Sequence, residues 1–142
     1  MGRIIAIDFG LKRTGIAVTD VNGVIAFPLE TVETRGLISF LKNYVSKEKV
    51  NSIVVGMPKQ ESGKDSSVAS EVRKLIAQLR KNFPKLELKE EDERYTSVLA
   101  QRALIDSGVK KMQRRDKSLV DVTSATILLQ SYLEKQLLKK RV

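Results

Sequence analysis

The sequence predicts an α/β fold built on one mixed, five-stranded sheet. Three strand-like segments come first, with the hairpin signal Asn22-Gly23 between the second and the third, and helices then alternate with two further strands. This βββαβαβα order is typical of a mixed sheet with helices on both faces. No linker, repeat or low-complexity segment interrupts the pattern, so residues 1–142 are expected to form a single domain.

The first three elements are predicted strands. Residues 3–8 form an apolar run that ends at Asp8, and residues 14–20 and 24–31 follow as the second and third strands. Because Pro28 lacks a backbone donor, the third strand is expected at an edge of the sheet.

The rest of the chain alternates helices with strands. Hydrophobic spacing predicts helices over 36–47, 67–82, 97–107 and 118–139, and strands over 52–55 and 86–91. Gly108 suits the end of the third helix, and a basic loop over 109–117 leads to the fourth. The face of the last helix that packs on the sheet is predicted from an apolar stripe of Leu119, Val122, Thr126, Leu129 and Leu133.

Composition restricts the chemistry that the chain can perform. It has no Cys and no His, which excludes thiolate zinc sites and His-dependent nucleophiles. Carboxylate oxygens remain, and they favour Mg²⁺ or Mn²⁺. The net charge of +9, from 26 Lys+Arg against 17 Asp+Glu, fits either a solvated basic surface or attraction to a polyanion. No signal peptide or membrane-length apolar run is visible, so a cytoplasmic location without a membrane partner is expected.

Acidic residues at the ends of three elements could meet in one cleft. Asp8 ends the first strand, Asp92 and Glu93 follow the strand over 86–91, and Asp121 lies near the start of the last helix. Parallel strands open at the same edge of a sheet, and a helix across that edge could bring its own acid there. Clustered carboxylates repel one another unless a cation lies between them, which favours a divalent metal site. Each acid alone also has a structural explanation, as a turn cap, a surface ion-pair partner or a helix-dipole partner.

Four motifs that occur in order along the chain point to a known family. They are residues 8–17 (Asp-Phe-Gly-Leu-Lys-Arg-Thr-Gly-Ile-Ala) with Asp20, Gly56-Met57-Pro58 with Gly63, residues 92–97 (Asp-Glu-Arg-Tyr-Thr-Ser) with Ala100, and Asp121 with Ala125, Ile127, Leu128, Gln130, Tyr132 and Leu133. Together they resemble the YqgF/RuvX family, described as Holliday-junction-resolvase-like, over nearly the whole chain.

The resemblance implies an RNase H-like fold and a hydrolase that cuts nucleic acid with Mg²⁺ or Mn²⁺. Asp8, Glu93 and Asp121 fall where that superfamily places its catalytic, metal-binding acids, with Asp92 as an alternative for the middle ligand. Two ions are expected, binding fully only with substrate. The family is linked to maturation of the precursor of 16S rRNA, the role expected here in ribosome biogenesis at the 5′ end, and to resolution of branched DNA.

Basic residues near these acids are expected to hold a nucleic-acid backbone. We expect Lys12 and Arg13 to contact phosphates near the scissile bond, and Arg94 either to orient Glu93 or to touch substrate. A clamp beside the cleft, or alternatively a solvated loop, is expected from Lys110, Lys111, Arg114 and Arg115. The expected partner is structured RNA or branched DNA, and a homodimer is left open.

Two other functions compete with this interpretation. A non-catalytic module that binds nucleic acid in ribosome assembly would need the fold and the basic loop but not the acids. Asp8-Phe9-Gly10 with Thr14-Gly15 also resembles the phosphate loop of actin-like ATPases and sugar kinases, where nucleotide lies between two such domains. The chain departs from the family at Ser124, where Ala is usual and where related resolvases carry a further acid, and at Lys59 and Gln60.

Overall fold

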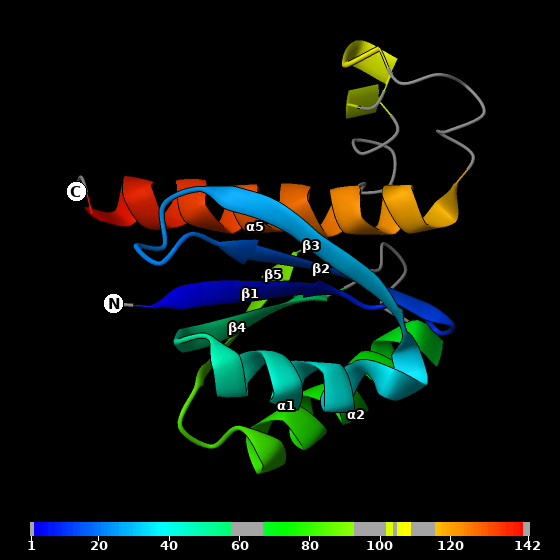
Figure 1. Ribbon diagram of the computed structural model, residues 1–142, viewed down its shortest axis with the longest axis vertical. Coiled ribbons are helices and arrows are strands. Elements are labelled where there is room, and N and C mark those ends of the chain that lie inside the picture. The colour runs from blue at the N-terminus through cyan, green and yellow to red at the C-terminus, as the bar shows by residue number, and fades with distance from the viewer. Residues whose placement is uncertain (1, 58–66, 93–101, 104, 109–115, 141–142) are drawn as a thin grey trace.

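The computed structural model describes residues 2–57, 67–92, 102–103, 105–108 and 116–140. Its strands are β1 (Arg3–Asp8), β2 (Arg13–Thr19), β3 (Ala26–Glu33), β4 (Val50–Met57) and β5 (Glu87–Asp92). Its helices are a short 3₁₀ turn η1 (Thr34–Gly36), α1 (Leu37–Lys47), α2 (Ser67–Asn82) and α5 (Lys117–Lys140). Figure 1 shows α1 and α2 on one face of the sheet and α5 across the other. The predicted mixed, five-stranded sheet with helices on both faces is confirmed.

The strand order is β3-β2-β1-β4-β5, which places the first strand in the centre of the sheet. β2 pairs antiparallel with β1 and with β3, whereas β4 runs parallel to both β1 and β5. The carboxyl ends of β1, β4 and β5 therefore open at one edge. Pro28 lies in β3 at the outer edge of the sheet, as predicted, and a register shift accompanies it between Ile16 and Ala17.

Strand alternation divides the core into two layers. Residues such as Ile5, Ile7 and Ile53 pack with Leu41 and other side chains of the α1–α2 layer. The layer under α5 is built from smaller residues of the sheet, and it comprises Ala6, Ala17, Val54, Ala125, Leu128, Leu129 and Tyr132. The short alanine side chains let α5 lie close to the sheet, because little volume separates the two backbones.

The backbone of α5 lies directly against Gly15 in β2. A Cβ atom at this position would overlap the backbone carbonyl of Asp121 and lie 3.0 Å from the backbone nitrogen of Val122. Any side chain at this position would push the helix away. Gly15 therefore fixes where α5 crosses β2.

The predicted turn at Asn22-Gly23 is present, since the Gly23 N–H donates to the carbonyl of Asp20 at 3.0 Å, but the connection between β2 and β3 extends beyond it to Ile25. The Asp20 carboxylate accepts hydrogen bonds from the backbone N–H groups of Val24 and Ile25, both at 2.8 Å, which takes these groups out of the sheet ladder. These bonds lower the pKa of Asp20, with the larger effect from Ile25. The third strand consequently begins at Ala26, two residues later than predicted, and Gly23 adopts a φ of 71° inside the loop.

The buried face of α5 also differs from the predicted stripe. The buried residues are Ser124, Ala125, Leu128, Leu129 and Tyr132, while Val122, Thr126 and Leu133 are only half buried. The contact at Gly15 fixes the rotation of the helix, and Ala6 and Ala17 leave room for Leu128 and Tyr132. Small residues on the sheet determine which face of α5 is buried. The spacing of apolar residues within the helix carries no information about them.

The predicted helix over 97–107 lies largely outside the described residues. Within it, residues 102–103 and 105–106 are helical, and Gly108 has a φ of 82°, as its predicted place at the helix end requires. Among the helices that the structure describes, none is long and apolar enough to cross a membrane.

Replacing Gly15 with alanine should destabilise the fold. The added methyl group would meet backbone rather than a flexible side chain, so we expect the free energy of unfolding to fall by about 1–3 kcal/mol or more. Urea denaturation of the purified variant measures the change. Gly36→Ala is the matched control, because a Cβ there meets nothing within 4 Å, and its stability should stay within about 0.5 kcal/mol of wild type.

Candidate active site

Asp8 lies at the carboxyl end of the central strand β1, half buried. Because Ile5 and Ile7 face α1 and α2, strand alternation puts Asp8 on the α5 face together with Ile4 and Ala6. Its partner in the antiparallel pairing with β2 is Gly15. Asp8 thus stands beside the position where the backbone of α5 lies against the sheet.

Asp121 lies in the second turn of α5, with its backbone against Gly15. Its side chain is 26% exposed. Since Gly15 is both the contact point of the Asp121 backbone and the sheet partner of Asp8, the backbones of two acids from distant parts of the sequence lie beside one glycine. The expected meeting of Asp8 and Asp121 rests on this contact.

Arg13 forms an ion pair with Asp121. Its Nε atom donates to Asp121 Oδ2 at 3.0 Å, and the Arg13 side chain is 38% exposed. Arg13 is two residues before Gly15 in β2, so it shares the α5 face of the sheet with that glycine. Arg13, which was expected to contact phosphate, is therefore paired with the candidate acid Asp121 in this structure.

The loop between β1 and β2 is held by threonines. The Thr34 hydroxyl donates to the carbonyl of Gly10 at 2.6 Å and accepts from the Thr14 hydroxyl at 2.8 Å, while the Thr34 backbone N–H donates to the carbonyl of Lys12 at 2.9 Å. These bonds fix the backbone on both sides of Leu11. Lys12 is exposed on this loop, beside the edge where Asp8 lies, so its position suits contact with a polyanion.

Asp92 ends β5, at the same edge of the sheet as Asp8. It pairs with Met57 of β4, which packs against the α1–α2 layer, so strand alternation turns Asp92 towards that layer and away from the face of Asp8. The remaining predicted site residues lie outside the described part of the chain: Glu93, Arg94, Lys110, Lys111, Arg114 and Arg115.

Glu91 and Lys135 form an interaction that the sequence reading missed. Glu91 is 6% exposed on the α5 face of β5, and its carboxylate accepts a hydrogen bond from Lys135 Nζ at 2.5 Å and one from the backbone N–H of Asp92 at 3.2 Å. The bond to Glu91 and the charge of Glu91 raise the pKa of Lys135. Alternation with Leu86 and Leu88 places Glu91 on the opposite face of the strand, but only the structure shows that α5 covers that face.

Ser124 is buried in α5 one turn after Asp121. Its side-chain oxygen has no hydrogen-bond partner among the residues that the structure describes. Helical spacing puts it on the side of α5 that carries Asp121 and, about three turns after Ser124, Lys135. Because Lys135 contacts Glu91 of β5, this side of the helix faces the sheet. The hydroxyl is thus an unused polar group on the acid-bearing side of the helix.

Within the described ranges, no group of three or more acidic side chains is arranged to hold a metal ion. The pair Asp8 and Asp121 is present on one face, and the predicted third acid Glu93 lies outside those ranges. Two carboxylates and a hydroxyl offer oxygen donors, which suit Mg²⁺ or Mn²⁺ better than softer metals.

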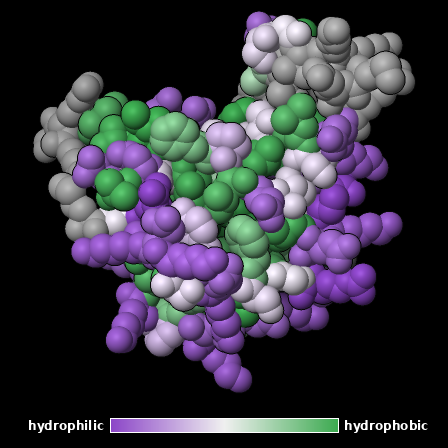
Figure 2. Space-filling view, viewed as in Figure 1, coloured by the Kyte–Doolittle hydropathy of each residue, from purple (hydrophilic) through white to green (hydrophobic). Residues whose placement is uncertain are grey.

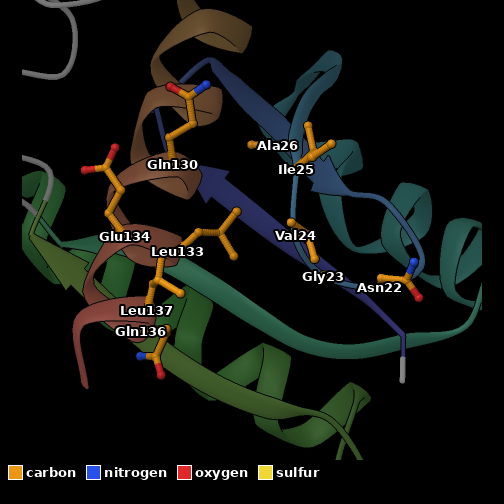
Figure 3. A pocket seen from close by; sticks show the side chains of 10 residues that line it. All are labelled: Asn22, Gly23, Val24, Ile25, Ala26, Gln130, Leu133, Glu134, Gln136 and Leu137. Carbon is orange, nitrogen blue, oxygen red and sulfur yellow. The ribbon is translucent and has the colours of Figure 1, made fainter. Parts of the chain in front are cut away.

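A groove of about 560 Å³ lies at the other end of the sheet. Figure 3 shows it between the β2–β3 connection, which carries Val24, and the last turns of α5, which carry Leu133 and Leu137. In Figure 2 apolar side chains gather over the sheet and α5, whereas the surface over α1 and α2 is largely hydrophilic. The connection follows the end of β2 that pairs with the start of β1, so the groove is separate from Asp8.

The stability of the protein should fall at alkaline pH. Burial, and then the charges of Glu87 and Glu91, raise the pKa of Tyr132 above its usual 10.0, and the pKa of Lys135 is raised above 10.5. Both groups bind their protons more tightly in the folded protein. Their contribution to the free energy of unfolding is therefore complete below the pKa values of the unfolded chain, and it is lost as the pH rises through the pKa values of the folded protein. Urea denaturation between about pH 9 and 11 measures this loss.

Lys135→Met separates the lysine contribution from the tyrosine contribution. The variant leaves the Glu91 carboxylate buried without its cation, and we expect a loss of about 1–3 kcal/mol at neutral pH. The free energy of unfolding of this variant should fall less steeply with rising alkaline pH than that of wild type. An unchanged decline in this variant would show that Lys135 does not contribute to it.

The chain was compared with known families and structures. The RuvX family, described as Holliday junction resolvase, matches residues 2–135. Among solved structures, a chain of T. thermophilus RuvC in complex with Holliday junction substrate aligns with a TM-score of 0.58 at 16% identity, covering 96% of each chain. This likeness concerns the fold, and it confirms the predicted RNase H-like fold.

Curated relatives are much closer in sequence. A protein of Phocaeicola vulgatus named "Putative pre-16S rRNA nuclease" is 52% identical over 134 residues, covering 94% of this chain and 96% of the relative. A protein of the same name from Flavobacterium psychrophilum is 46% identical over 137 residues, covering 96% and 100%. The match over nearly the whole chain and the shared fold confirm the predicted family: this chain belongs to the RuvX family.

Proposed function

We propose that this protein is a divalent-metal-dependent nuclease that hydrolyses phosphodiester bonds in structured RNA, with the precursor of 16S rRNA as its substrate. The observation that carries the proposal is the meeting of Asp8 and Asp121 around Gly15. Two carboxylates carried beside one glycine at a sheet edge offer the oxygen ligands that a divalent ion prefers.

Glu93 is the third acid of the proposed site. Asp92 lies on the face of β5 that turns towards the α1–α2 layer with Met57, opposite to the face of Asp8. Asp92 is therefore the weaker candidate for the partner of Asp8 and Asp121, and we take Glu93, the other acid of the motif over residues 92–97, in its place.

The residues present fit a divalent metal ion. Asp8, Glu93 and Asp121 would hold it through oxygen atoms, and the hydroxyl of Ser124 on the same side of α5, which has no hydrogen-bond partner within the described ranges, offers a further polar contact. A bound ion would supply Lewis-acid stabilisation of the charge that develops on the phosphate during hydrolysis. Lys12 and the basic segment 109–117 would hold the nucleic-acid backbone without reading its sequence. Such a role fits a protein of the cytoplasm.

Two observations bear on the substrate and point in different directions. Relatives at 46–52% identity carry the name of a pre-16S rRNA nuclease, which favours the RNA precursor. The family description names Holliday junctions, which makes a four-way DNA junction the second candidate. Cleavage assays on both substrates in Mg²⁺ and in Mn²⁺ decide between them. Binding to either without cleavage would instead favour a non-catalytic module of ribosome assembly.

Asp8→Asn should abolish cleavage while leaving nucleic-acid binding intact. Loss of a direct metal ligand should cost more than the roughly 10–100-fold that changes around the ligands produce, so we expect at least about a 100-fold fall in cleavage rate. Chelation of the metal should have the same effect on wild type. Single-turnover cleavage and filter binding measure the two properties, and full cleavage by the variant would exclude the proposed site.

Asp92→Asn and Glu93→Gln form a matched pair for the middle acid. Because Asp92 faces the other side of the sheet, its variant should cleave within about threefold of wild type, whereas Glu93→Gln should lose cleavage as Asp8→Asn does. The same single-turnover assay applies to both. The reverse result would make Asp92 the ligand.

A further inference from the structure

The candidate metal site already contains a positive charge. Arg13 Nε lies 3.0 Å from Asp121 Oδ2, so one of the acids proposed to hold a divalent ion is paired with a guanidinium. Removing that cation would leave the acid cluster with more negative charge, and placing a metal ion beside it would bring two cations together. A metal ion held by Asp121 would therefore have to compete with Arg13 for that carboxylate.

The ion pair between Arg13 and Asp121 is exposed enough to water to open. The Arg13 side chain is 38% exposed and that of Asp121 26%, and ion pairs in contact with water are held weakly. Glu33, the sheet partner of Arg13 on β3, carries an ion pair of its own with Arg35 at 3.5 Å. The alternative partner that substrate would bring is a phosphate, whose oxygens match a guanidinium as well as a carboxylate does.

We propose that Arg13 is an exchangeable counter-ion that couples metal binding to nucleic-acid binding. In the free protein Arg13 neutralises Asp121 and weakens the affinity for a divalent ion. When a phosphate backbone reaches this edge of the sheet, Arg13 moves to a phosphate oxygen and Asp121 becomes available to the metal ion. The proposal rests on the proposed metal site, and it adds that the site is kept weak until substrate arrives.

Such coupling must be reciprocal. If nucleic acid strengthens metal binding through Arg13, then metal must strengthen nucleic-acid binding by the same factor. Factors of about 5–150 are typical of coupled sites. If Arg13 only held Asp121 in place, its removal would weaken metal binding instead of strengthening it.

The test is a calorimetric titration of Mn²⁺ into the full-length protein without nucleic acid. Arg13→Gln should bind Mn²⁺ about 10-fold more tightly than wild type, because the competing charge is gone. Arg13→Lys keeps the charge and should bind as wild type does. Lys12→Gln is the matched control: it removes a neighbouring exposed charge outside the ion pair and should change Mn²⁺ affinity by less than about threefold.

The second measurement repeats the titration with a cleavage-resistant precursor-rRNA hairpin or four-way DNA junction bound, whichever the protein retains. Nucleic acid should tighten Mn²⁺ binding about 10-fold in wild type and much less in Arg13→Gln. Thermal unfolding of each variant confirms that it is folded. An equal effect of nucleic acid on wild type and Arg13→Gln would overturn the exchange.

The outcomes separate this proposal from the proposed function. If Mn²⁺ binds to wild type and is lost in Asp8→Asn, but Arg13→Gln binds no more tightly than wild type, the metal site stands and the counter-ion role is wrong. If neither wild type nor Arg13→Gln binds Mn²⁺, in the absence or in the presence of bound nucleic acid, both the metal site and the exchange are wrong. Tighter binding in Arg13→Gln that disappears when Asp8→Asn is added supports both.

Discussion

The close approach of α5 to β2 at Gly15 is the constraint on which the rest of the structure depends. It sets the position and the rotation of the helix, and so decides which residues of α5 are buried. It also brings Asp121 to the strand pair that carries Asp8. One missing side chain thus determines both the packing of one face of the sheet and the meeting of the candidate acids.

The layers that cover the two faces of the sheet differ in composition. The α1–α2 layer holds the larger aliphatic side chains and supplies most of the buried apolar volume. The α5 layer is built on small residues and carries two ion pairs: the pair of Arg13 with Asp121 near the start of α5 and the pair of Glu91 with Lys135 further along. Asp8 and Asp121 thus belong to the face with the smaller core, apart from the larger aliphatic cluster.

Local patterns in the sequence predicted most of the fold but not all of the candidate site. Asp8 at a strand end and Pro28 at a sheet edge follow from strand chemistry, which acts within a few residues. The late start of β3 depends on side-chain bonds of Asp20, and the buried face of α5 depends on small residues in distant strands. The pairing of Arg13 with Asp121 joins residues far apart in sequence, which periodicity cannot reveal.

The order of elements along the chain has a consequence for synthesis. β1 contributes Asp8 near the start of the sequence, while α5 contributes Asp121 near its end and also covers one face of the sheet. During synthesis Asp121 can reach the strand pair that carries Asp8 only after most of the chain has been made. A chain truncated before α5 therefore lacks Asp121 together with the cover over one face of its sheet.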